Sequence, residues 1–233
     1  MQRLGASFAA SHADTSVEVI PGLGSSGGIA AVLDNVLDLA VSARPLKPAE
    51  QGLTAIVAVR TPYGLVSSNP NPGDIAKAEV AAFYANPAAT WPDGTSVRVV
   101  LRPKSESDTA LLGETFPGMA AAIEKIRARI DVPVAATDQD NLEMASTIKG
   151  SLVGTSLTQM VTENYQSQLH FLTIDGAKPT LENLESGVYP YSKPYRFVFA
   201  EEPSPLVRRF MDFIASSEGK SILRASGSLS ATR

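Results

Sequence analysis

The feature that most constrains the fold is the alternation, along most of the chain, of short apolar segments with segments of helical periodicity. Residues 54–59 read TAIVAV, a nearly continuous apolar run typical of a strand covered on both faces of a sheet. The alternation predicts an α/β fold. Strands are expected at residues 17–20, 38–41, 54–59, 97–101, 132–136, 151–155, 171–174 and 195–200, and helices at residues 2–12, 28–37, 49–53, 73–85, 109–116, 119–130, 141–149, 156–164, 180–186, 205–216 and 218–225.

The composition excludes several classes of function. The chain of 233 residues has no Cys and only two His, so thiolate chemistry, Fe–S clusters and a metal site are not expected, and no cofactor is implied. The net charge of −4 argues against a nucleic-acid partner, which normally requires a basic face. No apolar run approaches the roughly 18 residues of a membrane span, so direct membrane insertion is not expected.

A glycine-rich loop, PGLGSSGG at residues 21–28, lies between a predicted strand and a predicted helix. It matches three patterns at once. The first is G-x-G-x-x-G, the dinucleotide fingerprint, and the second is G-x-S-x-G, the nucleophile elbow, with Ser26 as the nucleophile. The third is a helix N-terminus with adjacent hydroxyls on Ser25 and Ser26, which favours an anion.

Two of these interpretations lack support elsewhere in the chain. The dinucleotide fingerprint requires an acidic residue at the end of the next strand, but that strand is followed by Ser42, Ala43 and Arg44. A serine hydrolase would use Ser26 with Asp138 or Asp140 and with His170, yet nucleophile elbows follow several strands and this loop follows the first. The hydrolase stays a minor alternative. A serine-capped turn that binds no ligand is also open.

A second polar loop strengthens the anion hypothesis. Residues 102–109 read RPKSESDT and lie between a predicted strand and a predicted helix. They supply the guanidinium of Arg102, hydroxyls of Ser107 and Thr109, and another helix N-terminus. An arginine fork suits the geometry of an oxyanion, and hydroxyl and backbone donors can replace much of its water. Taken alone, this loop could equally be a surface helix capped by Ser or Asp.

Five segments, in this order, resemble the phosphate-binding proteins of bacterial ABC phosphate importers, which belong to the periplasmic solute-binding protein superfamily. The resemblance extends from about Leu4 to Leu229. The GSSGG loop and the C-terminal pattern from YP to EG are its most specific parts. The segments are GLGSSGGIAAV, LDLAVSARPLKPAE, TDQDN, PTLENLESGVYPYSKPYRFVF and FMDFIASSEGKSIL.

The resemblance implies a periplasmic-binding-protein type II fold, with two α/β lobes joined by a two-segment hinge. Residues 1–62 and 168–233 would form lobe one, and residues 63–167 lobe two. The family normally opens with a strand and a ligand-contacting loop, whereas this chain opens on a predicted helix, so the first strand is expected to be lacking. Binding in the interlobe cleft would close the lobes on the hinge.

The resemblance also implies which residues contact the ligand. In lobe one these are Ser25, Ser26 and the Gly27 amide, with Ser42 in the turn after the next strand. In lobe two they are Arg102, Ser107 and Thr109 at the second loop, where Asp108 replaces the expected Gly. No catalytic residue and no metal ligand is implied.

Two departures from the family pattern bear on the ligand. Where well-known members carry an Asp that accepts a phosphate proton, this chain has Ala43 followed by Arg44. Asp108 could cap its helix, or could accept a phosphate proton in place of the missing carboxylate. If its charge pointed inward without such a proton, it would disfavour dianions.

The chain is therefore expected to be a solute-binding component of an ABC importer and not an enzyme. Its partners would be phosphate or another small oxyanion and the membrane permease of the importer, and its location periplasmic or extracytoplasmic. The main alternative is a family relative with a degenerate site that acts as an interaction or structural protein. In that case Arg102 would be turned away from a filled cleft.

Overall fold

The computed structural model describes residues 1–231, and its contacts divide the chain into two compact units. Unit 1 consists of Met1–Arg60 and the chain from Pro194 onward, and unit 2 is Thr61–Lys193. The chain passes between the units inside two long strands, β2 (Leu53–Ser67) and β8 (Ser192–Ala200). The first crossing lies close to the expected position.

The second crossing lies later than the sequence predicted. It falls between Lys193 and Pro194 instead of near residues 167 and 168. The physical reason is burial, because Leu172, Ile174 and Tyr189 lie in the main hydrophobic core of unit 2. The segment after residue 168 thus belongs to unit 2.

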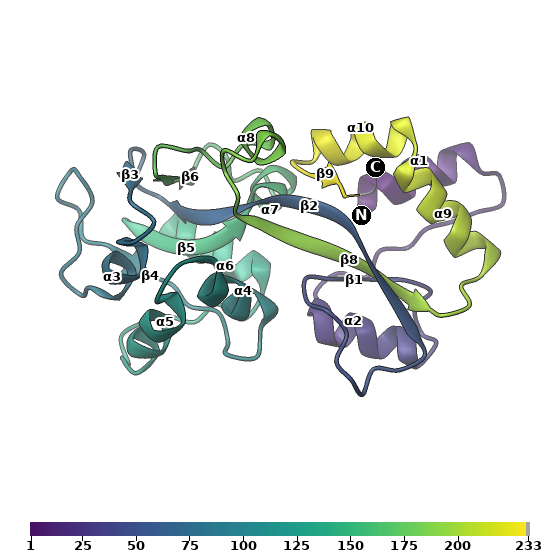
Figure 1. Cartoon of the computed structure of the whole chain (residues 1–233), viewed down its shortest axis with the longest axis horizontal. Coiled ribbons are helices and arrows are strands. Elements are labelled where there is room, and N and C mark those ends of the chain that lie inside the picture. The colour runs from purple at the N-terminus through teal and green to yellow at the C-terminus, as the bar shows by residue number, and fades with distance from the viewer. Residues whose placement is uncertain (232–233) are drawn as a thin grey trace. The chain divides into compact units, whose positions relative to one another are not determined.

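Within residues 1–231, unit 1 combines a small sheet with four helices. Besides its parts of β2 and β8, its elements are α1 (Gln2–Ser11), α2 (Gly24–Leu33), β1 (Ala40–Ser42), α9 (Pro205–Ala215), α10 (Ser217–Ala225) and β9 (Leu229–Ser230). Strand β1 pairs antiparallel with β8, with Ala40 opposite Val198 and Ser42 opposite Arg196. Helices α1, α9 and α10 pack together (Figure 1), and Phe8 contacts Phe210 and Phe213 with ring centroids 5.1 and 5.5 Å apart.

Unit 2 is built around β5 (Ser151–Ser156), which pairs antiparallel with the second half of β2 and parallel with β4 (Arg98–Val99). Trp91 anchors a loop on this unit by donating its indole N–H to the Gly150 carbonyl over 2.9 Å. The other elements of unit 2 are β3 (Asp74–Ile75), α3 (Val80–Ala85), α4 (Ser107–Thr115), α5 (Met119–Arg127), α6 (Asp138–Thr147), α7 (Leu157–Thr162), β6 (His170–Phe171), β7 (Thr173–Ile174) and α8 (Leu181–Ser186).

The α/β prediction is confirmed, and the differences concern the bounds of elements and three short elements that do not form. The strand expected at residues 132–136 is reduced to one isolated bridge between Val134 and Leu101. Residues 17–20, expected as a strand, are irregular. Residues 49–52 of the helix expected at 49–53 are turn or irregular, and Leu53 is the first residue of β2. The helix expected at 28–37 starts earlier, at Gly24, so the GSSGG segment forms its first turn. At the other end, Leu229 and Ser230 form β9 and pair with Arg60 and Val59 of β2.

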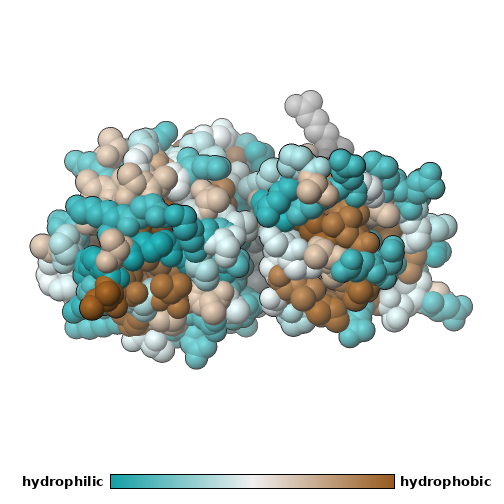
Figure 2. All heavy atoms as spheres, turned by 90° about the horizontal axis from the view of Figure 1, so that it is seen from below, coloured by the Kyte–Doolittle hydropathy of each residue, from teal (hydrophilic) through white to brown (hydrophobic). Residues whose placement is uncertain are grey.

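The surface carries apolar side chains on both units, which appear brown between hydrophilic areas in Figure 2. Exposed examples are Leu33 and Val36 in unit 1, and Ile130 and Val188 in unit 2. Single exposed apolar residues are common on folded proteins, so they assign no partner surface. Within residues 1–231, every helix is too short or too polar to span a bilayer.

Candidate functional site

In unit 1, the first turn of α2 presents backbone N–H groups near several hydroxyls. Leu23 occupies the N-cap position, where its apolar side chain supplies no acceptor. Gly22 and Gly24 have φ of 81° and 63°, a region that favours glycine, and they make the turn into the helix. The first N–H groups of a helix have no partner inside the helix, and its dipole makes this end positive.

The hydroxyls of Ser25 and Ser42 shape the turn that follows β1. Ser25 Oγ accepts the Ala43 N–H over 3.1 Å, which ties the first turn of α2 to this turn. Ser42 is fully buried, and its Oγ donates to the Arg44 carbonyl (2.8 Å) and accepts the Arg44 N–H (3.2 Å). The predicted residues Ser25, Ser26, Gly27 and Ser42 therefore lie in one small region of unit 1.

Two arginines border the same turn. Arg44 donates to Ser26 Oγ from Nη2 (3.2 Å) and Nε (3.4 Å). Nη2 also donates to Glu50 Oε1 (2.6 Å), and Nη1 donates to Glu50 Oε2 (2.9 Å). The hydrogen bonds from Arg44, with a further one from the Lys47 N–H, lower the pKa of Glu50 to about 2. Arg196 donates from Nη1 to the Ala43 carbonyl over 3.2 Å. No pattern in the sequence indicated Arg196, because this residue is brought to the turn by the pairing of β8 with β1.

In unit 2, Arg102 is buried and held in a fixed orientation. Its Nη1 donates to the Ala135 carbonyl over 2.8 Å, and its Nη2 donates to Asp138 Oδ1 over 3.0 Å. Glu106, at the N-cap of α4, lies 3.6 Å from the same Nη2. The backbone of this loop is also anchored, because Arg127 donates to the Arg102 carbonyl over 3.0 Å. The guanidinium is thus positioned by the protein itself.

The first turn of α4 holds the three predicted residues Ser107, Asp108 and Thr109. Asp108 forms a buried ion pair with Lys193, whose Nζ lies 2.6 Å from Oδ1 and 2.8 Å from Oδ2. Thr109 Oγ1 donates to the Pro103 carbonyl over 2.9 Å and so closes the loop before the helix. Lys193 was missed, because no local pattern links it to a residue so distant in sequence.

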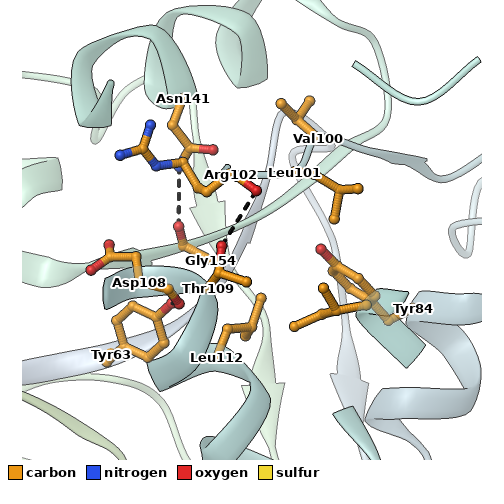
Figure 3. Close-up of a pocket in the computed structure, with 11 residues that line it drawn as sticks. Tyr63, Tyr84, Val100, Leu101, Arg102, Asp108, Thr109, Leu112, Asn141 and Gly154 are labelled. Carbon is orange, nitrogen blue, oxygen red and sulfur yellow. Dashed lines mark hydrogen bonds between the residues drawn. The ribbon is translucent and has the colours of Figure 1, made fainter. Parts of the chain in front are cut away.

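A small cavity inside unit 2 is lined by Arg102, Asp108, Thr109 and Asn141, among others (Figure 3). Its free volume of about 10 Å³ accommodates roughly one water molecule. Asn141 Nδ2 donates to the Gly154 carbonyl over 3.1 Å, which fixes the orientation of the amide. Among residues 1–231, Arg102 Nε and Asn141 Oδ1 are buried without a hydrogen-bond partner. The cavity is therefore bordered by one donor and one acceptor that are still available.

The groups required by the hydrolase alternative are engaged in other interactions. Ser26 Oγ contacts the Arg44 guanidinium, which only donates hydrogen bonds and so cannot take a proton from a nucleophile. Asp140 forms a capping box with Thr137 at the start of α6, with bonds of 2.9 and 3.0 Å. Asp138 pairs with Arg102, and His170 lies in β6 opposite Ser67. Ser26 belongs to unit 1, whereas Asp138, Asp140 and His170 belong to unit 2.

Comparison with solved structures identifies the class of fold. A protein from Clostridium perfringens assigned as a phosphate ABC transporter substrate-binding protein, with bound phosphate, has 20% identity and a TM-score of 0.82, covering 99% of this chain and 94% of that one. An ABC-type phosphate transport receptor from Vibrio cholerae has 17% identity and a TM-score of 0.66, covering 98% and 93%. At these identities the likeness establishes a periplasmic-binding-protein fold.

The same fold occurs in another context. The regulatory domain of MetR, a LysR family regulator from N. meningitidis, has 9% identity and a TM-score of 0.56, covering 98% of this chain and 91% of that one. A family model described as the PBP superfamily domain matches residues 1–218. The chain belongs to the PBP superfamily. Comparison with curated proteins gave no match.

Proposed function

We propose that this protein is the solute-binding component of an ABC importer and that it binds phosphate or a similar oxyanion. It would perform no chemistry, act outside the cytoplasmic membrane and deliver its ligand to the permease. The observation that carries the proposal is that each unit brings together a helix N-terminus, hydroxyls and an arginine. The resemblance of the GSSGG loop to phosphate-binding proteins and the likeness to a phosphate-bound structure support it.

In unit 1, the proposed contacts are Ser25, Ser26 and the Gly27 amide at the start of α2, together with Ser42 at the turn. The turn itself is neutral, but Arg44 and Arg196 border it, and among the described residues the carboxylate that pairs with one of them, Arg44, is that of Glu50. A local excess of positive charge beside a helix N-terminus favours an anion. The net negative charge of the whole chain does not oppose this, because nearby charges and dipoles dominate at short range.

In unit 2, the proposed contacts are Arg102 and the start of α4, with Ser107, Asp108 and Thr109. Arg102 is held by Ala135 and Asp138, so little side-chain entropy is lost when it binds a ligand. We propose that one oxyanion is enclosed by the two sets of donors when the units close upon it. Closure around a ligand is a common motion of two-domain binding proteins.

One observation favours the alternative of a relative with a degenerate site. Both Arg44 and Arg102 are already paired with carboxylates, Glu50 and Asp138 respectively. In that alternative these arginines stabilise the units and bind no ligand. The protein would then act through its surface as an interaction or structural protein, since the PBP fold is not confined to transport, as the MetR regulatory domain illustrates.

The proposal is tested by thermal unfolding in the presence of phosphate, sulfate and other small oxyanions. A ligand that binds only the folded protein raises its melting temperature in a concentration-dependent way. We expect a shift for at least one oxyanion in the wild type, and a much smaller one in Arg102→Met. Arg129→Met is the matched control, because Arg129 is a solvent-exposed arginine of unit 2 that pairs with Asp131. Equal shifts in Arg102→Met and wild type would exclude Arg102 from the site.

A further inference from the structure

Four charged side chains form one cluster at the start of α4, here called the α4 charge cluster: Arg102, Asp108, Asp138 and Lys193. Lys193 contacts both oxygens of Asp108 and lies 4.0 Å from Asp138 Oδ2, while Arg102 lies 3.0 Å from Asp138 Oδ1. The side chains of Lys193 and Asp108 are only 3% and 7% exposed. The cluster is therefore continuous, and its Lys193–Asp108 pair is almost completely removed from water.

The α4 charge cluster contains two cations and two carboxylates, and Glu106 adds a third carboxylate at its rim, 3.6 Å from Arg102. In its most buried part, Lys193 compensates the charge of Asp108. Without Lys193 the Asp108 carboxylate would be uncompensated, and charges interact strongly where water is largely excluded. An uncompensated carboxylate here would therefore act strongly on an anion beside α4.

Asp108 alone would oppose an anion at this position. It lies in the first turn of α4, between Ser107 and Thr109, where a carboxylate stabilises the helix but repels a negatively charged ligand. Its two oxygens are directed at Lys193 Nζ, so its charge is compensated within unit 2. An independent sign of a ligand-accepting surface is Arg102, which is nine-tenths buried and lines the adjacent cavity with an unpartnered Nε within residues 1–231.

We infer that Lys193 is a specificity-determining residue of this site: by compensating Asp108 it allows the start of α4 to accept an oxyanion, and the Asp108–Lys193 pair sets the ligand charge that the site accepts. The inference rests on the proposed function. It assigns a role to a residue of β8 that lies 85 positions from Asp108 in the sequence. It also makes Asp108 a charge-balancing group instead of an acceptor for a phosphate proton.

The test compares phosphate affinity below and above the second ionisation of phosphate, so that the same ligand is presented mainly as a monoanion or mainly as a dianion. In Lys193→Met the uncompensated Asp108 repels the ligand in proportion to ligand charge. We expect affinity to fall about tenfold for the monoanion and about a hundredfold for the dianion. In Asp108→Asn the change has the opposite sign, because affinity is expected to rise, again more for the dianion than for the monoanion.

Two controls separate charge from folding. Asp108→Asn combined with Lys193→Gln removes both charges and retains hydrogen-bonding side chains, so we expect its affinities to return toward wild type for both forms of phosphate. Lys125→Met removes an exposed lysine of unit 2 and should leave the ratio of dianion to monoanion affinity unchanged. Circular dichroism confirms the folding of each variant before titration.

The outcomes are distinguishable. If the wild type binds neither form of phosphate nor any other oxyanion, the proposed function fails and this inference fails with it. If the wild type binds but Lys193→Met loses monoanion and dianion equally, or loses neither, only the inference is overturned. If Lys193→Met does not fold, Asp108→Asn and the double variant provide the test. An unchanged ratio of dianion to monoanion affinity in Asp108→Asn then overturns the inference.

Discussion

The start of α2 in unit 1 and the start of α4 in unit 2 use the same elements but differ in charge. Both combine a helix N-terminus with hydroxyls and an arginine. Around α2, Arg44 and Arg196 outnumber Glu50. Around α4, the cations Arg102 and Lys193 lie among three carboxylates, Asp108, Asp138 and Glu106. The two regions therefore share a helix N-terminus and hydroxyls but differ in their charged neighbours, which under the proposed function would set the ligand charge that each region accepts.

The two regions also differ in the burial of their ion pairs. Arg44 and Glu50 keep 16% and 14% of their side chains exposed, whereas Lys193 and Asp108 keep 3% and 7%. A pair that retains contact with water contributes little to stability, while breaking a buried pair leaves an uncompensated charge in the interior. The effect of removing one partner should therefore be much larger in unit 2.

The largest expected effect comes from Lys193→Met. Because it leaves the buried Asp108 carboxylate unpaired, we expect the free energy of unfolding to fall by about 3–5 kcal/mol. Urea unfolding measures this change. The double variant Asp108→Asn with Lys193→Gln should recover a substantial part of the loss, since paired sites are not additive. A loss below about 1 kcal/mol in Lys193→Met would mean that the pair is far better hydrated than its burial indicates.

A smaller effect is expected from Thr137→Ala at the start of α6, the capped counterpart of α2 and α4. Thr137 Oγ1 accepts the Asp140 N–H over 3.0 Å, and the Asp140 carboxylate accepts the Thr137 N–H. Because removing a cap of this kind costs about 1 kcal/mol, we expect the free energy of unfolding to fall by that amount. Urea unfolding measures the change. Leu23→Ala at the start of α2 removes no capping bond and should cost less. A larger loss of unfolding free energy in Leu23→Ala than in Thr137→Ala would contradict this comparison of the two helix starts.

The pair in unit 1 predicts a modest pH dependence. Glu50 has its pKa lowered from 4.5 to about 2 in the folded chain, so its contribution is present above pH 4.5 and is lost as pH falls toward 2. Because the pair remains partly solvated, we expect this loss to be about 1 kcal/mol. Arg44→Met should remove that part of the pH dependence. Unfolding measured against pH gives the comparison, and identical profiles for wild type and variant would contradict it.

The smallest expected effect on stability comes from Ser26→Ala. The Ser26 hydroxyl accepts from Arg44 at the protein surface, so we expect the free energy of unfolding to change by no more than about 0.5 kcal/mol. Oxyanion affinity should nevertheless fall about tenfold, because a donor or acceptor to a charged ligand is lost. Ser11→Ala, a serine of α1 bonded to backbone carbonyls, is the control. Unchanged affinity in Ser26→Ala would remove Ser26 from the proposed site.

Local sequence patterns predicted much of the α2 region. The GSSGG loop indicated a helix N-terminus, which depends on residues close together in sequence. The position of Ser42 was implied only by the family resemblance, and in the structure Ser42 is the last residue of β1. The register of the helix was less accurate, because its glycines are poor helix formers and its first turn is held by packing, with Gly28 close to Ala40.

Residues that arrive by long-range pairing could not be predicted. Arg196 reaches the turn of unit 1 because β8 pairs with β1 and places it opposite Ser42. Lys193 reaches Asp108 because the last part of unit 2 packs against the core that contains Leu172 and Tyr189. Because of the same packing, the chain crosses from unit 2 to unit 1 between Lys193 and Pro194. Local periodicity carries no information about such pairings.

The most direct test of the central claim is isothermal titration of the wild-type protein with phosphate. The account predicts saturable heat with one phosphate per chain, and a weaker or absent signal in Arg102→Met under the same conditions. If the folded wild type gives no binding heat with phosphate or with any other small oxyanion at millimolar concentration, and no thermal shift, the claim that this chain is an oxyanion-binding protein is contradicted.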